Sequence, residues 1–187
     1  MTSRLGSWQP EGAEQRLDRM ESMAEIRQLV ARYALAVDTR DLEALAGLFS
    51  PTVRIGRDKV GRDALREWFG PILSEMRVSV HFVGTHIIEF TDADHASGIV
   101  YCRDELERPA TQKWDVGQLQ YSDDYVRVDG EWCFDRRRFS RWYIVDVLSR
   151  PSHAAGVDKG SGHLPTNLLP DSYPSWQAYW TRHELRQ

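Results

Sequence analysis

The spacing of apolar residues changes once along this chain, near Val78, from a helical period to a strand-like one. Three earlier segments repeat apolar residues every three or four positions, as helices with one buried side do: 26–37, 42–49 and 62–69. Four later segments are rich in Val, Ile, Phe, Tyr and Trp, which favour strands: 78–90, 96–107, 114–128 and 131–145. Helices followed by a meander of strands predict an α+β fold, with the helices on one face of a curved, mainly antiparallel sheet.

Local signals divide the chain at the same places. Asp41 predicts the N-cap of the second helix, and Ser50-Pro51 predicts its end. Gly70-Pro71 predicts that the third helix stops near Phe69, and a further helical turn around Ile72 to Met76 is left open. Asp129-Gly130 predicts a tight hairpin, because both residue types tolerate positive φ angles.

The 187 residues, 41% of them hydrophobic, are enough for one domain with a full core. We expect residues 1–19 to be an N-terminal arm, 20–150 to be the folded domain and 151–187 to be a tail. That tail is expected to end in a short helix with an aromatic face, which covers the pocket of the domain or packs on a second subunit. The face contains Trp176, Tyr179 and Trp180. The broad sheet favours a homodimer or homotrimer.

Charge and cysteine usage exclude several classes of partner. The net charge of −4 argues against a nucleic-acid-binding protein, and Arg136-Arg137-Arg138 is expected to alternate along a strand, with one arginine pointing inward. No apolar stretch has the length of a membrane span or a secretory signal, so a cytoplasmic protein is expected. Cys102 and Cys133 do not have metal-ligand spacing; we expect reduced thiols, and neither a metal nor a cofactor.

Two titratable residues far apart in sequence are candidates for an acid/base pair. Asp38 lies at the end of the first helix, at the margin of its apolar side. His81 shares a strand face with Ser79, whereas Phe82 takes the opposite face, and Gly84 marks a bulge. Each residue alone is more often structural, the histidine in a core and the aspartate as a cap. Placed together in a pocket, they would form a base and its partner.

Other side chains belong to the same candidate pocket. Tyr33 lies on the apolar side of the first helix, and Tyr121 and Arg141 lie on strand faces. The structural alternative is equally weighted: Tyr33 as a core tyrosine, and Arg141 as the ion-pair partner of an acid such as Asp104. The shape of a substrate pocket would depend on further residues, namely Trp68, Phe82, His86, Trp114, Leu119 and Phe139.

Several motifs together resemble the SnoaL-like branch of the NTF2-like superfamily. They are Ile26–Tyr33, Asp38, Leu42–Leu45, Leu48–Pro51, His81 with Ile87–Phe90, and Asp124–Trp132. Within that branch the chain is most similar to bile acid 7α-dehydratases, and more distantly to scytalone dehydratases and hexachlorocyclohexane dehydrochlorinases. The resemblance spans about residues 20–150 and implies a cone-shaped α+β barrel with a deep apolar pocket.

The resemblance also implies roles for single residues. It assigns His81 as the catalytic base and Asp38 as the residue that orients it. Tyr33 and Arg141 match the tyrosine and arginine of the family's pocket, and Tyr121 is a weaker match.

The implied reaction is a cofactor-independent elimination of water from a small hydrophobic substrate. That substrate would be a polycyclic or aromatic hydroxy-carbonyl compound, steroid-like or polyketide-like. An isomerase or a polyketide cyclase would use the same pair of residues, and non-catalytic proteins that bind small ligands share the fold. The family's extra pocket tyrosine has no counterpart here, because Ile55 and Gly56 occupy its place.

Overall fold

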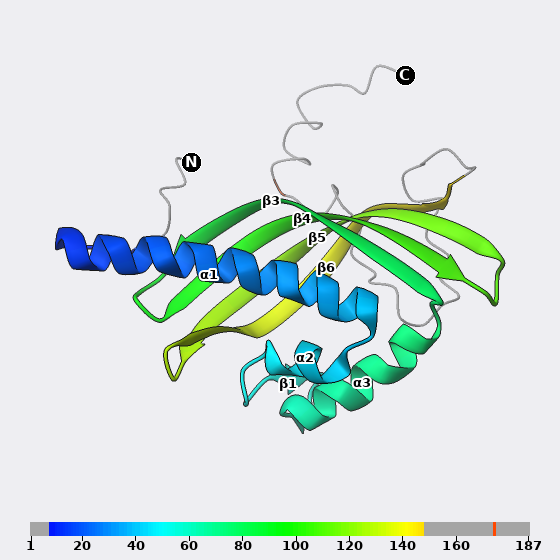
Figure 1. Ribbon diagram of the computed structural model, residues 1–187, viewed down its shortest axis with the longest axis horizontal. Coiled ribbons are helices and arrows are strands. Elements are labelled where there is room, and N and C mark those ends of the chain that lie inside the picture. The colour runs from blue at the N-terminus through cyan, green and yellow to red at the C-terminus, as the bar shows by residue number, and fades with distance from the viewer. Residues whose placement is uncertain (1–7, 148–173, 175–187) are drawn as a thin grey trace, which may run out of the picture.

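The computed structural model describes residues 8–147 and Pro174. The elements in chain order are α1 (Gly12–Thr39), α2 (Leu42–Gly47), β1 (Arg54–Ile55), β2 (Lys59–Val60), α3 (Arg62–Ser74), β3 (Val78–Phe90), β4 (His95–Arg108), β5 (Lys113–Val128) and β6 (Glu131–Asp146). Figure 1 shows α1 running across one face of a curved sheet, with α2 and α3 gathered near one end of that helix. The predicted α+β class, with helices packed on an antiparallel sheet, is confirmed.

The main sheet has the strand order β3-β4-β5-β6, and each strand is antiparallel to its neighbour. All four strands were predicted to within one or two residues at each end. Asp129 and Gly130 have φ angles of 52° and 85°, which confirms the tight hairpin between β5 and β6. The register of β3 shifts between Val83 and His86, which confirms the bulge at Gly84.

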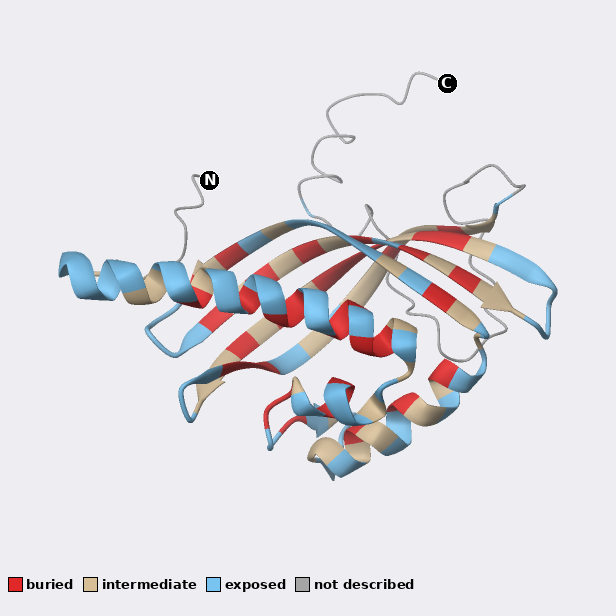
Figure 2. Cartoon of the chain, in the orientation of Figure 1, coloured by how far each residue is buried: buried red, intermediate tan, exposed pale blue. Residues whose placement is uncertain are grey.

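The face of the sheet that α1 covers, called here the inner face, carries the core. Figure 2 shows buried and less buried positions alternating along the strands, as expected where one face packs on a helix. Arg137 has a side chain only 4% exposed, whereas Arg136 and Arg138 are exposed, so the predicted inward arginine is Arg137. Cys102 and Cys133 are buried free thiols, as expected.

The helices depart from the prediction in two places. Helix α1 begins at Gly12, so residues 12–19 of the expected arm are helical. Helix α3 continues through Pro71 to Ser74, and the predicted end near Phe69 is wrong. A proline inside a helix removes a hydrogen bond. Burial of Leu73 one turn beyond Phe69 opposes that loss, because it extends the apolar side of α3.

The start of α2 was predicted correctly. The side chain of Asp41 accepts a hydrogen bond of 2.9 Å from the backbone N–H of Ala44, as an N-cap does. Within residues 8–147, no helix combines the length and the apolar character that crossing a membrane requires. The aromatic helix expected around Trp176, Tyr179 and Trp180 lies outside the described residues.

Candidate active site

The structure brings Asp38 and His81 together. The Nδ1 atom of His81 lies 2.6 Å from Oδ1 of Asp38, and the backbone N–H of His81 donates to Oδ2 at 2.8 Å. The Ser79 hydroxyl also donates to Oδ1, at 3.0 Å. One carboxylate is therefore held by three donors from a single strand. We call Asp38 and His81 the dyad.

The position of Asp38 follows from its place in α1. It lies in the last turn, beside the buried residues Ala34 and Val37, and its side chain is 21% exposed, whereas that of His81 is 9% exposed. Partial burial alone would raise the pKa of Asp38. The hydrogen bonds and charge of His81, together with Ser79, outweigh that effect and lower the pKa below its ordinary value. Asp38 is therefore a carboxylate at neutral pH.

The hydrogen-bond partner determines the histidine tautomer. An ionised carboxylate can only accept, so the Nδ1 atom of His81 carries a proton in this contact. Nε2 is then the nitrogen that can accept a proton from another molecule. This is the arrangement that a general base requires.

A buried ion pair lies beside the dyad on the inner face. Both terminal nitrogens of Arg141 donate to Asp104, at 3.0 and 2.8 Å, and the two side chains are 6% and 2% exposed. The pair crosses Gly117, where a Cβ atom would collide with both partners. The structure thus realises the alternative in which Arg141 pairs with Asp104. A role for Arg141 toward a substrate stays a prediction.

Tyr33 and Tyr121 belong to a second cluster on the inner face, centred on Arg137. The guanidinium of Arg137 lies 4.2 Å from the ring centre of Tyr33 and 4.0 Å from that of Tyr121. Burial raises the pKa of Tyr33 to about 12 and that of Tyr121 well above its ordinary value. Both hydroxyls stay protonated at neutral pH and can act as neutral donors.

The same cluster continues to His86 through hydrogen bonds. Arg137 donates to both oxygens of Asp123, at 2.8 and 2.6 Å, and the Tyr125 hydroxyl donates to Asp123 at 2.7 Å. His86 Nε2 lies 3.0 Å from that hydroxyl. Because the Tyr125 hydroxyl donates its one proton to Asp123, it can only accept from His86, and His86 Nε2 is therefore the donor. Burial lowers the pKa of His86 to about 4, so His86 is neutral at physiological pH.

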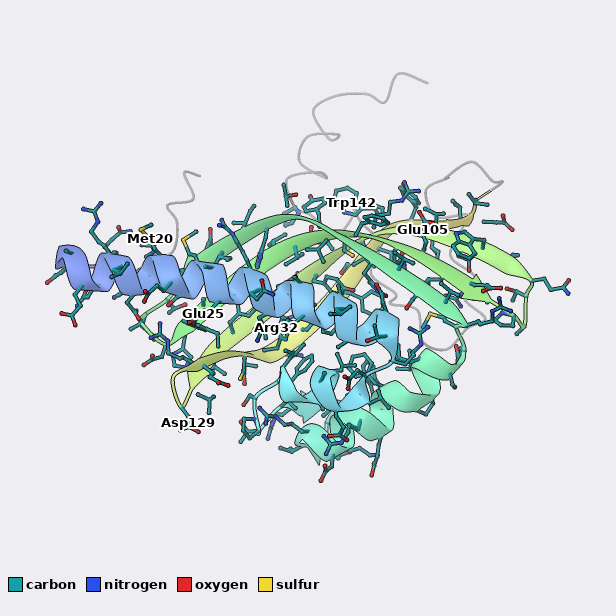
Figure 3. The ribbon with its side chains drawn as sticks, in the orientation of Figure 1. Met20, Glu25, Arg32, Glu105, Asp129 and Trp142 are labelled. Carbon is teal, nitrogen blue, oxygen red and sulfur yellow. The ribbon has the colours of Figure 1, made fainter. Side chains whose placement is uncertain are left out.

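Three predicted substrate-binding residues have exposed side chains. Phe82 is 61% exposed, because strand alternation turns it to the face opposite His81. Trp68 is 45% exposed, outside the buried side of α3, and stacks edge-on against Phe69. Trp114 is 37% exposed and donates to Glu105, which Figure 3 shows on the side of the sheet away from α1. A role for these three residues in binding a substrate stays a prediction.

Leu119 and Phe139 face inward as expected. Leu119 is 2% exposed and is part of the core, and Phe139 is partly buried beneath Arg141, 5.6 Å from its guanidinium. In the sheet, Leu119 pairs with Cys102 on β4 and with Arg141 on β6. Both residues therefore lie close to the Asp104–Arg141 pair.

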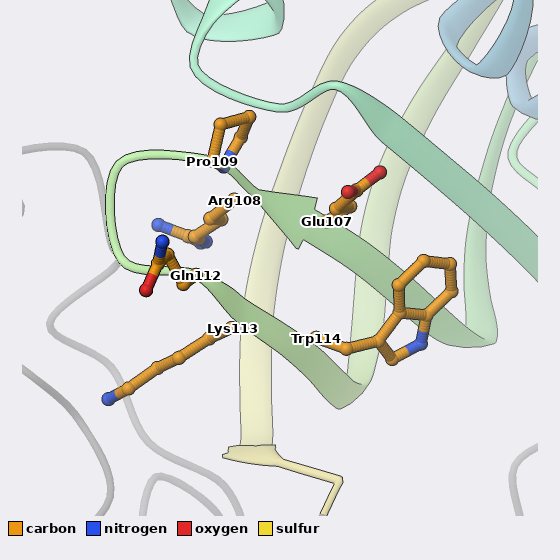
Figure 4. Close-up of a pocket in the computed structure, with 6 residues that line it drawn as sticks. All are labelled: Glu107, Arg108, Pro109, Gln112, Lys113 and Trp114. Atoms are coloured by element: carbon orange, nitrogen blue, oxygen red, sulfur yellow. The ribbon is translucent and has the colours of Figure 1, made fainter.

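A cavity of about 400 Å³ lies elsewhere, at the hairpin between β4 and β5. Most of the residues that line it are polar, and Figure 4 shows all six: Glu107, Arg108, Pro109, Gln112, Lys113 and Trp114. The predicted apolar pocket at the dyad stays a prediction. Among the described residues, no three His, Cys, Asp or Glu side chains lie close enough together to hold a metal ion.

Comparison with known proteins gives the family. The SnoaL-like domain matches residues 18–138, more than half of the 187 residues. The chain belongs to the SnoaL-like domain family. An uncharacterized relative from Mycobacterium tuberculosis is 29% identical over 119 residues, which cover 60% of this chain and 80% of that protein.

Solved structures share the fold of this SnoaL-like domain. A protein from Novosphingobium aromaticivorans, assigned as a scytalone dehydratase, has a TM-score of 0.63 at 23% identity, covering 76% of this chain and 98% of that one. A hexachlorocyclohexane dehydrochlorinase from Novosphingobium barchaimii has a TM-score of 0.63 at 22% identity, covering 76% and 97%. At these identities the likeness shows the fold. The narrower resemblance to bile acid 7α-dehydratases stays a prediction.

The sequence reasoning missed two parts of this SnoaL-like site. Arg40 donates a hydrogen bond to Ser79 on β3. The spacing of apolar residues in the sequence does not indicate this contact. Asp123 and Tyr125 complete the cluster around Arg137. Their alternation with Tyr121 along β5 was the one available signal.

Proposed function

We propose that this SnoaL-like protein is a cofactor-independent lyase that removes water from a hydrophobic hydroxy-carbonyl compound, steroid-like or polyketide-like. The observation that carries the proposal is the 2.6 Å contact between His81 Nδ1 and Asp38, which leaves Nε2 as a base. Two proteins with the same fold are named as a dehydratase and a dehydrochlorinase, and both names describe eliminations. Those names support the choice of an elimination over other reactions.

The proposed reaction begins with proton transfer from carbon. His81 Nε2 takes a proton from the carbon alpha to the substrate carbonyl, and the electron pair of that C–H bond moves toward the carbonyl as an enolate. The pair then forms the C=C bond while the C–O bond at the beta carbon breaks. The departing hydroxide takes the proton from the His81 imidazolium. Water leaves, and His81 is neutral again.

The other residues would stabilise the charges that form. Asp38 is ionised and bonded to Nδ1, so it opposes the positive charge on His81 after proton transfer. The protonated hydroxyls of Tyr33 and Tyr121 are suited to donate to an enolate oxygen. The Nε–H of Arg141 is buried without a hydrogen-bond partner among the described residues, which would leave it available to the same oxygen.

The test is turnover with hydroxysteroids and aromatic hydroxy-carbonyl compounds, followed by mass detection of water loss. Asp38→Asn and His81→Ala should each lower the rate by roughly 10² to 10⁴ while the fold is retained. Asp92→Asn is the matched control, because Asp92 forms a similar contact with His95, at 3.0 Å, but on the exposed surface. Retained turnover in either dyad variant would contradict the proposal.

The product separates the alternatives that use the same dyad. An isomerase would return a solvent proton to carbon without loss of oxygen, so a reaction in deuterated water would add mass to the product. A cyclase would retain the mass of its substrate and form a ring. A non-catalytic protein would bind the ligand and return it unchanged, and the dyad variants would not alter the outcome.

A further inference from the structure

Arg40 adopts an unfavourable backbone conformation next to the dyad. It follows α1 directly and has a φ angle of 62°, in the left-handed region that favours glycine. The other described non-glycine residues with positive φ are Gln112 and Asp129, which lie in hairpin turns. An arginine at this position suggests that its side chain does something that glycine could not.

The guanidinium of Arg40 connects the end of α1 to the start of β3. Its Nη1 donates to the carbonyl of Val37 at 2.6 Å, and its Nη2 donates to the carbonyl of Met76 at 2.9 Å. Nη1 also donates to the Ser79 hydroxyl oxygen at 2.6 Å. Arg40 therefore touches both segments that carry the dyad.

The contact with Ser79 sets the direction of the next hydrogen bond. A serine hydroxyl has one proton, and Arg40 has no acceptor, so the Ser79 oxygen accepts from Arg40. Its proton is then free to point at Oδ1 of Asp38, 3.0 Å away. The same Oδ1 receives Nδ1–H of His81. Three consecutive hydrogen bonds thus run from Arg40 through Ser79 and Asp38 to His81.

We propose that Arg40 is a positioning residue for the dyad, acting through Ser79 to fix the Asp38 carboxylate that selects the His81 tautomer. The catalytic meaning of the dyad rests on the proposed function. The geometric claim does not, because the tautomer of His81 can be measured without any substrate. The competing explanation is that Arg40 only caps the last carbonyls of α1.

The test uses nitrogen NMR of the full chain labelled with ¹⁵N-histidine. In the parent protein, His81 should be the Nδ1–H tautomer, with widely separated ¹⁵N shifts. In Arg40→Gly and in Ser79→Ala, the Nε2–H tautomer should appear and the two shifts should move toward each other. The double variant should show no larger change than Arg40→Gly alone, because both residues act in one chain.

One control variant, Asp129→Gly, and one test variant, Ser79→Ala, distinguish positioning of the dyad from an effect on folding. Asp129→Gly removes the same kind of positive-φ strain at the tip of the β5–β6 hairpin, where Figure 3 labels Asp129, and should leave the His81 tautomer unchanged. Ser79→Ala keeps the contacts of Arg40 with the α1 carbonyls, so it tests the chain of hydrogen bonds without disturbing the helix end.

The outcomes of this test are distinct from those of the turnover test. An unchanged His81 tautomer in both Arg40→Gly and Ser79→Ala would overturn the proposal, and Arg40 would then be a helix cap alone. A changed tautomer in a protein that turns over no substrate would support the positioning of the dyad and count against the lyase function instead.

Discussion

Asp104 lies directly opposite His81 in the ladder between β3 and β4. Side chains opposed in this way have Cβ atoms about 5 Å apart. The side chains of His81 and Asp104 are therefore neighbours on one face of the sheet, and Arg141 binds Asp104 through two hydrogen bonds. Because both oxygens of Asp104 accept from Arg141, Asp38 is the carboxylate that orients His81.

The first prediction concerns loss of that ion pair. Arg141→Met would leave the Asp104 carboxylate buried without its partner, at 2% exposure. Removing one partner of a buried pair costs about 3–5 kcal/mol, and we expect a loss of that size in the free energy of unfolding. Urea denaturation of the purified variant measures it.

The double variant Asp104→Leu/Arg141→Met is the control for this prediction. It replaces both charges with apolar side chains, so no buried charge is left unpaired. We expect the double variant to recover most of the stability lost by Arg141→Met. Equal losses in the single and double variants would show that packing, and not the unpaired carboxylate, is responsible.

The second prediction concerns Gly117, which the ion pair crosses. A methyl group there would collide with Asp104 and Arg141, so we expect Gly117→Ala to lower the free energy of unfolding by about 1–3 kcal/mol. Gly47→Ala in α2 is the matched control, because a Cβ at Gly47 meets nothing within 4 Å. It should be neutral or stabilising by up to about 1 kcal/mol. Similar unfolding curves for the two variants would contradict the argument.

Sequence periodicity predicted the elements but not how they meet. The strands were found because their residues alternate and are rich in β-branched and aromatic types, signals that lie within each segment. The contact between Asp38 and His81 depends on how α1 crosses β3, which no local signal contains. The sequence offered the two residues as a candidate pair, and the resemblance to SnoaL-like proteins assigned their roles. Strand alternation alone places Phe82 on the face opposite His81.

The partner of Arg141 and the role of Arg40 could not be predicted from the sequence for a similar reason. The bond between Arg141 and Asp104 spans from β6 to β4 across Gly117 on β5, so it depends on two strand registers. The sequence allowed this pair as an alternative without favouring it. The role of Arg40 depends on its left-handed conformation, which residue type does not predict because arginine rarely adopts it.

The third prediction concerns the arginine at the centre of the second cluster. Arg137 makes two hydrogen bonds to Asp123 and lies within 4.2 Å of the ring centres of Tyr33, Tyr121 and Phe134. A lysine cannot reproduce a planar, bidentate and stacked contact. We expect Arg137→Lys to lower the free energy of unfolding by about 2–4 kcal/mol, measured by chemical denaturation.

The neighbouring residue offers a control for this substitution. Arg138 pairs with Asp124 on the surface, where the two side chains are 46% and 44% exposed. Exposed ion pairs contribute little, so Arg138→Lys should change the free energy of unfolding by less than about 0.5 kcal/mol. A comparable loss in both variants would mean that the stacked contacts of Arg137 do not matter.

The last prediction is a dependence of stability on pH. Burial chiefly lowers the pKa of His86 from 6.5 to about 4, although the charge of Asp123 opposes the shift. Between these two values the unfolded chain binds a proton that the folded chain does not bind. The free energy of unfolding should therefore fall as the pH drops from 6.5 towards 4. Because His86 is partly exposed, we expect a contribution on the order of 1–2 kcal/mol.

Substitution of the histidine isolates this contribution. His86→Gln keeps an N–H group that can donate to the Tyr125 hydroxyl but cannot titrate, so its stability should fall less over the same pH window. His95→Gln replaces a histidine whose side chain is 60% exposed and should keep the full dependence of the parent protein. Urea denaturation at several pH values between 4 and 7 makes the comparison. Parallel curves for the parent protein and His86→Gln would show that His86 does not carry the effect.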